Sequence, residues 1–244
     1  MIWYIPALLT TLMVWIICVA IALPLFGIGL VILTVTLIFD PQRRILHQYS
    51  CLWASIYTWI NPFWSIRIRG RHKIPNRTAC MIVSNHQSLV DILVLYRLFR
   101  HFKWVAKAEL FNVPVFGWHM SLNRYIRIKR NDRRSQFQML KTAIATLQSG
   151  SSVMIFPEGT RTDDGQLKRF KEGAFAIAKK APAPIVPIVI DGSYRAMPKQ
   201  SLMMHRVRIQ VDVLDPIPVE KVVEMDTNEL SQTVHNMIRD KLQQ

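Results

Sequence analysis

The first 39 residues contain no Asp, Glu, Lys or Arg, and the first charged side chain is that of Asp40. About 20 consecutive apolar residues are enough to cross the hydrocarbon core of a bilayer, and this run is longer. A cleaved signal peptide is disfavoured because the run lacks a basic N-terminal region and exceeds the usual apolar length. We therefore predict a membrane-associated helical segment, with Pro24 as a candidate kink.

A second helix is expected over residues 41–60, with Asp40 and Pro41 as its cap and first-turn proline. It carries aromatic side chains that favour the membrane–water boundary, namely Trp53, Tyr57 and Trp59. The apolar leader therefore either spans the membrane once or forms with this helix a hairpin that enters one leaflet. A buried hairpin within a soluble protein is the less favoured alternative. We divide the chain into N-terminal apolar helices, residues 1–62, and a globular domain, residues 63–244.

The chain is strongly basic, with 31 Lys and Arg against 16 Asp and Glu, a net charge of +15. Such a balance calls for an anionic partner: nucleic acid, an anionic membrane face or phosphorylated substrates. We find no zinc-finger, helix-turn-helix or Gly-rich RNA-binding signature, which disfavours nucleic acid. Basic residues soon after an apolar segment mark the cytoplasmic side of a membrane: Arg67, Arg69, Arg71 and Lys73. We expect the protein at the cytoplasmic face of the cytoplasmic membrane.

Three cysteines, an odd number, do not form a paired disulfide framework. None of them stands at metal-ligand spacing from any of the seven histidines. The sequence therefore predicts neither a disulfide scaffold nor a bound metal.

Beyond residue 62, short apolar runs alternate with helical patterns, which predicts an α/β fold with a mostly parallel sheet flanked by helices. Strands are expected at residues 79–83, 125–128, 153–156, 185–190 and 207–214. Helices are expected at residues 88–100, 135–149, 171–180 and 227–242.

Two polar side chains follow the first of these strands, with four residues between His86 and Asp91. At the carboxyl end of a parallel strand they would face the ligand crevice. A neutral imidazole can take a proton from a hydroxyl near pH 7, and a carboxylate on its other nitrogen fixes tautomer and orientation. Asp91 also fits a helix cap together with Ser88, and the two interpretations are compatible. No Gly-x-Ser-x-Gly nucleophile is present, so direct transfer to a hydroxyl is the simpler mechanism.

A second motif, Phe-Pro-Glu-Gly-Thr-Arg at residues 156–161, ends another predicted strand. Pro157 breaks the strand and Gly159 permits a turn, which displays Glu158 and Arg161 at the strand end. A plain turn with two solvated charges is the alternative. A guanidinium at this place is suited to bidentate binding of phosphate.

The two motifs, in this order, resemble those of the glycerolipid acyltransferases, and among them the 1-acyl-glycerol-3-phosphate acyltransferases. Two weaker blocks also resemble the family, residues 125–130 and 186–190, although Lys129 stands where the family often has Asp. The segment 107–117 is similar as well. The resemblance covers roughly residues 65–200.

The resemblance implies transfer of a fatty acyl group from acyl-CoA or acyl carrier protein to the free hydroxyl of a lysophosphatidate, giving phosphatidate, with no cofactor or metal. His86 would be the base and Asp91 its orienting partner. The implied substrate-binding residues are Glu158, Gly159, Thr160, Arg161, Arg130 and Lys107. Glu158 would position the acceptor glycerol, and the three cations would hold its phosphate.

The sequence is also compatible with other functions. Within the enzyme class, the acceptor is instead another lysolipid, glycerol 3-phosphate or an amino-acid-based lipid. A basic, non-catalytic membrane-binding protein is a further alternative, which the presence of both His86 and Asp91 disfavours. Membrane lipids are expected partners in every case.

Overall fold

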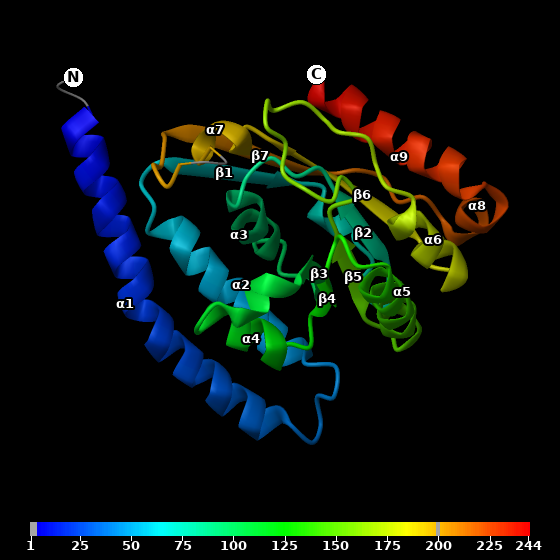
Figure 1. Cartoon of the computed structure of the whole chain (residues 1–244), viewed down its shortest axis with the longest axis horizontal. Coiled ribbons are helices and arrows are strands. Elements are labelled where there is room, and N and C mark those ends of the chain that lie inside the picture. The colour runs from blue at the N-terminus through cyan, green and yellow to red at the C-terminus, as the bar shows by residue number, and fades with distance from the viewer. Residues whose placement is uncertain (1–3, 199–200) are drawn as a thin grey trace.

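The computed structural model describes residues 4–198 and 201–244, and within them seven strands form one sheet covered by helices on both faces (Figure 1). The strands are β1 (Trp64–Arg69), β2 (Met81–Ser84), β3 (Phe102–Lys107), β4 (Ile126–Ile128), β5 (Ser152–Ile155), β6 (Ile185–Asp191) and β7 (Val207–Val213). Their order is β1-β7-β6-β2-β5-β3-β4, and each neighbouring pair is parallel except β6 with β7. The predicted mostly parallel α/β fold is confirmed.

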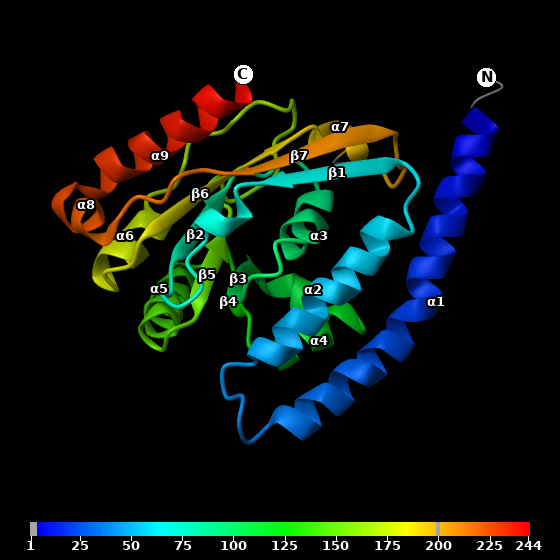
Figure 2. The same cartoon turned by 180° about the vertical axis from the view of Figure 1, so that it is seen from behind.

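The helices are α1 (Tyr4–Thr36), α2 (Arg44–Trp59), α3 (Val90–Tyr96), α4 (Phe116–Leu122), α5 (Arg133–Gln148), α6 (Gly173–Lys180), α7 (Ser193–Ala196), α8 (Val219–Glu224) and α9 (Thr227–Leu242), with short 3-10 turns η1 (Arg71–Lys73) and η2 (Ala108–Asn112). Helices α2 and α3 cover one face of the sheet, and α5, α6 and α9 cover the other (Figures 1 and 2).

Alternation along the strands divides the core between these two layers. In β2, Ile82 packs into the cluster beneath α2 and α3, whereas Met81 and Val83 pack into the cluster beneath α5, α6 and α9. Each of these three side chains is fully buried. Because both faces are covered, the strand reads as a continuous apolar run in the sequence.

Several boundaries differ from the sequence-based expectation. Strands β1 and β3 and helix α4 were not predicted, and the helix expected at residues 88–100 is confined to α3. The helix expected from residue 41 begins only at Arg44. Asp40 does cap it, but from a distance: its carboxylate accepts the N–H groups of Arg44 and Ile45 at 2.9 and 2.8 Å.

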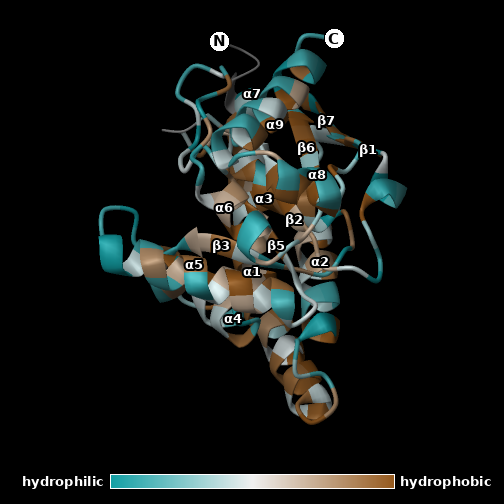
Figure 3. Ribbon diagram, turned by 90° about the vertical axis from the view of Figure 1, so that its right-hand side faces the viewer, coloured by the Kyte–Doolittle hydropathy of each residue, from teal (hydrophilic) through white to brown (hydrophobic). Residues whose placement is uncertain are grey.

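Helix α1 is long and apolar enough to cross a membrane, and it follows a bent path with Pro24 inside it (Figure 1). The end of α1 and the residues that follow form a hydrophobic tip at the lower end of the molecule (Figure 3), where Ile38 is 94% exposed. Yet one face of α1 is buried against α2, because Val14, Cys18 and Ala22 pack with Trp53. Residues 1–3 of the predicted leader lie outside the described residues.

Helix α2 belongs to the globular core rather than to the leader alone. Its Cys51 and Ala54 lie in the same cluster as Ile82, and the Nε2–H of buried His47 donates to the carbonyl oxygen of Arg100 at 3.0 Å. A boundary at residue 62 would therefore remove part of the core, whereas a cut before Asp40 removes only α1 and the tip.

We expect the two truncations to behave differently. Removing residues 1–39 should leave a folded protein with a lowered Tm, because it uncovers the surfaces of α2 and α4 around Trp53 and Trp118 and leaves the sheet covered. Removing residues 1–60 should prevent folding, because each lost core side chain costs on the order of 2–4 kcal/mol. Circular dichroism melts in detergent measure both. If the protein that lacks residues 1–60 unfolded cooperatively at the Tm of the full-length protein, the assignment of α2 to the core would be wrong.

Candidate active site

The loop after β2 is rigid and buried, and it presents one imidazole. Asn85 acts as an extension of the strand, accepting the Ile190 N–H at 2.8 Å and donating to the Ile190 carbonyl oxygen at 2.7 Å. The His86 carbonyl oxygen accepts the N–H of Thr162 at 3.0 Å. The His86 ring stacks on Phe156, with ring centroids 3.9 Å apart and planes at 8°. The ring therefore has one well-defined orientation.

Asp91 lies in the first turn of α3 and is fully buried. Its Oδ2 accepts three N–H groups: those of the His86 Nδ1 at 2.9 Å, the Gln87 backbone at 2.6 Å and the Ser88 backbone at 2.8 Å. An acceptor-only carboxylate requires the proton on Nδ1, which leaves Nε2 as the basic nitrogen. Both readings of Asp91 thus hold, since it orders the turn before α3 and orients the imidazole.

The second motif forms a tight turn after β5. The Gly159 N–H donates to the Phe156 carbonyl oxygen at 3.0 Å, and Gly159 has a φ of +75°, which a residue with a side chain rarely adopts. The Glu158 carboxylate is buried and links two segments: Oε1 accepts the His86 N–H at 2.7 Å and Oε2 accepts the Lys168 N–H at 3.0 Å. Burial raises the pKa of Glu158 to about 7.

The candidate residues come together because they follow adjacent parallel strands. His86 follows β2, the 156–161 turn follows β5, Lys107 ends β3, and Arg130 follows β4. Ligands of open α/β sheets bind at such an edge. A cavity of about 320 Å³ lies there, with the His86 ring on its wall. Apolar side chains provide most of the rest of the wall, including Ile92, Trp104, Met120, Ile128, Met139, Leu140 and Ile155.

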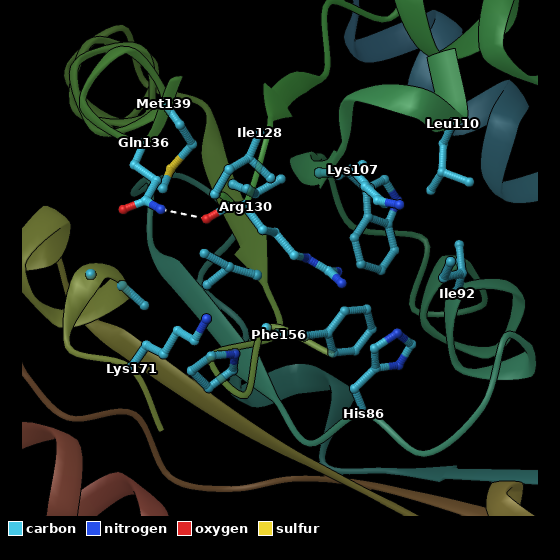
Figure 4. A pocket seen from close by; sticks show the side chains of 18 of the residues that line it. His86, Ile92, Lys107, Leu110, Ile128, Arg130, Gln136, Met139, Phe156 and Lys171 are labelled. Atoms are coloured by element: carbon cyan, nitrogen blue, oxygen red, sulfur yellow. Dashed lines mark hydrogen bonds between the residues drawn. The ribbon is translucent and has the colours of Figure 1, made fainter. Parts of the chain in front are cut away.

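The predicted substrate-binding residues divide into two groups. Lys107, Arg130 and Gly159 line the cavity, and in Figure 4 the guanidinium of Arg130 points into it. Arg161 is not among the lining residues, and its carbonyl oxygen accepts the Lys168 ammonium at 2.9 Å. Thr160 follows Gly159 in the turn without lining the cavity. The roles assigned to all of these residues stay predictions.

Lys171 is a cavity residue that the sequence analysis did not single out. It precedes α6 and lines the same cavity as His86 (Figure 4). Its backbone N–H donates to the Pro157 carbonyl oxygen at 2.9 Å, which folds its segment back onto the turn. The only available signal was a Lys two residues before a Gly, shortly after the second motif. In residues 4–198 and 201–244, no group of His, Cys, Asp and Glu is arranged to hold a metal ion.

The raised pKa of Glu158 predicts a pH-dependent stability. An unfolded Glu ionises near 4.5, whereas the folded group holds its proton up to about 7. The stability contributed by the protonated group is therefore full below pH 4.5 and is lost as pH rises through 7. Relative to Glu158→Gln, the wild type should lose on the order of 3 kcal/mol between pH 4.5 and 8. Denaturant unfolding of both proteins across this range measures the difference. If the free energies of unfolding of the two proteins changed with pH in the same way, the pKa of Glu158 would not be raised.

Comparison with known proteins agrees with this geometry. The family model described as Acyltransferase matches residues 65–191. A chloroplastic 1-acyl-sn-glycerol-3-phosphate acyltransferase of Brassica napus is 42% identical over 76% of this chain and 55% of its own length. A chloroplastic protein of the same activity name from Arabidopsis thaliana is 42% identical over 74% of this chain and 51% of its own length. The chain thus spans about half the length of these plant relatives.

A solved structure matches nearly the whole chain. The crystal structure of the 1-acyl-sn-glycerophosphate acyltransferase PlsC from Thermotoga maritima aligns with a TM-score of 0.82 at 26% identity, over 98% of this chain and 95% of that one. The match includes the N-terminal helices as well as the sheet. The family model covers more than half of the chain and contains both motifs. The chain therefore belongs to the acyltransferase family whose members include the 1-acyl-sn-glycerol-3-phosphate acyltransferases.

Proposed function

We propose that the protein is a membrane-associated 1-acyl-glycerol-3-phosphate O-acyltransferase, which moves a fatty acyl group from a thioester donor to the free hydroxyl of a lysophosphatidate. The observation that carries the proposal is the His86–Asp91 pair: the two side chains are 2.9 Å apart, and the imidazole lies on the wall of a mostly apolar cavity that is also lined by cations. The names of the relatives support the same acceptor.

The reaction needs one proton to move twice. The His86 Nε2 takes the proton of the acceptor hydroxyl as its oxygen attacks the thioester carbonyl carbon. The tetrahedral intermediate then collapses, the carbon–sulfur bond breaks, and the leaving thiolate receives that proton from the imidazolium. Asp91 stabilises the transient imidazolium through the Nδ1–H. General-base assistance of this kind contributes about 10²–10⁴-fold in rate.

The wall of the cavity matches the two chemical halves of the substrates. Ile128, Met139 and Leu140 offer an apolar surface for an acyl chain, while Arg130 and Lys107 offer positive charge for a phosphate. The donor is acyl-CoA or acyl carrier protein, both of which are anionic and suit the basic surface of the chain.

The arrangement of α1 supports attachment to one leaflet rather than a simple span. Contacts with the globular part run along the helix. The indole N–H of Trp15 in α1 donates to the Leu202 carbonyl oxygen at 3.0 Å, and the Tyr49 hydroxyl donates to the carbonyl oxygen of Leu25 in α1 at 2.6 Å. A helix that crossed the bilayer perpendicular to the membrane plane would lose these contacts with the globular part. We propose that the outer face of α1 lies in the lipid of the cytoplasmic leaflet.

The function is tested by offering lysophosphatidate with acyl-CoA and, separately, with acyl carrier protein to membranes that contain the protein. Phosphatidate should form, and His86→Ala should lower the rate at least 100-fold, because the base is lost. His72→Ala, an exposed histidine outside the cavity, is the matched control and should keep full activity. A fully active His86→Ala protein would remove His86 from the mechanism.

Membrane attachment is tested on the exposed face of α1, where Ile16, Val19 and Leu23 are each more than 60% exposed. Replacing all three by Asp should shift the protein from the membrane to the soluble fraction, since each charge in hydrocarbon costs about 2.5–3.5 kcal/mol. The Tm should change little because these side chains make no core contacts. Unchanged sedimentation with membranes would assign the anchor to another surface.

A further inference from the structure

Lys171 differs from Lys107, another cation of the cavity, because its ammonium group forms no ion pair with a carboxylate of the described residues. It lines the cavity, and in Figure 4 its ammonium group points inward together with the guanidinium of Arg130. Within the described part of the chain, neither Lys171 nor Arg130 has a carboxylate at ion-pairing distance. Two unpaired cations from separate segments thus face the same space near His86.

The other two candidate cations are less available. Lys107 lines the cavity, but its ammonium is paired with the Glu109 carboxylate at 3.6 Å. Arg161 does not line the cavity. A phosphate that enters beside the imidazole therefore meets Arg130 and Lys171 before it meets Arg161.

Gly159 leaves the space in which the Lys171 side chain lies. A Cβ at position 159 would stand 3.0 Å from the Lys171 Nζ and 3.1 Å from its Cε. The backbone hydrogen bond from Lys171 to Pro157 holds the two segments in this register. The glycine of the second motif therefore serves two purposes, since it allows the turn and it lets an ammonium group lie across that turn.

We propose that Lys171, with Arg130, binds the phosphomonoester of the acceptor and so selects a phosphorylated lysolipid over neutral or zwitterionic ones. The proposal rests on the proposed function and deepens it. A phosphomonoester carries up to two negative charges near pH 7, which match one ammonium and one guanidinium. A phosphocholine headgroup carries only one negative charge, on its phosphodiester, and adds a cation of its own. A monoacylglycerol brings no anion at all, so neither lipid supplies the two negative charges that the pair would match.

The test compares Lys171→Met with Lys171→Arg, using Lys180→Met at the exposed end of α6 as the matched control. Lys171→Met should raise the KM for lysophosphatidate about 10- to 100-fold, the loss expected for one charge-assisted contact, with kcat changed less than about 3-fold. Lys171→Arg should recover part of this loss. The KM for the acyl donor should stay unchanged in all three variants, and discrimination against lysophosphatidylcholine and monoacylglycerol should fall in Lys171→Met only.

Gly159→Ala supplies an independent test of the same geometry. Its methyl group would displace the ammonium, and at a φ of +75° it would also strain the turn, so Gly159→Ala should raise the KM for lysophosphatidate. The part of this rise that comes from the ammonium should be absent when Gly159→Ala is added to Lys171→Met. Equal melting temperatures of Lys171→Met and wild type establish that the fold is intact.

A direct binding measurement separates this proposal from the proposed function. Dodecyl phosphate should raise the Tm of the wild type and of Lys180→Met, and should fail to do so for Lys171→Met, whether or not turnover is observed. Three results would overturn the proposal: an unchanged acceptor KM in Lys171→Met, a raised KM for the donor in its place, or an equal Tm shift in that variant. Absence of acylation by the wild type, with the Tm difference retained, would overturn only the proposed function.

Discussion

One carboxylate oxygen organises the candidate active site. Asp91 Oδ2 accepts three N–H groups at 2.9 Å or less, from the His86 ring and from the two residues that follow it. Because the carboxylate is fully buried, water does not compete for these bonds. The same oxygen therefore fixes the course of the loop, the tautomer of the imidazole and the direction of Nε2. The stacked Phe156 ring then blocks rotation of the imidazole out of the cavity.

A second buried carboxylate connects this centre to the cation side of the cavity. Glu158 accepts one N–H from His86 and one from Lys168, which lies three residues before Lys171. The two oxygens of one carboxylate therefore tie the backbone at His86 to the segment that leads to Lys171. Each of its two oxygens accepts a backbone N–H group, and the role in acceptor binding that the family resemblance implied for Glu158 stays a prediction. The energetic cost of burying it appears as the raised pKa.

The sequence was sufficient to predict the residues at the ends of β2, β4 and β5, because buried parallel strands appear as short apolar runs. It was not sufficient for β3, where Lys103 and Lys107 interrupt the run. Lys103 is buried all the same: its ammonium donates to the Asn123 carbonyl oxygen at 2.7 Å, and burial lowers its pKa to about 7. Lys171 was missed for another reason, since it is brought to the cavity by hydrogen bonds of its segment to Pro157 and Glu158, which lie 10 or more residues away in the chain.

Helix α4 and turn η2 relate the cavity to the proposed membrane surface. On the inner side, Leu110 and Met120 line the cavity. On the outer side, the Trp118 ring packs against Phe26 of α1 at 5.9 Å and is half exposed. A wall only one helix thick therefore separates the space beside His86 from the surface on which α1 lies. Moving a 16-carbon chain from lipid into water costs on the order of 10 kcal/mol, at about 0.8 kcal/mol per CH₂. On the proposed function, a wall this thin would shorten the path over which that chain is exposed, so the contacts between α1 and α4 would serve substrate entry as well as attachment.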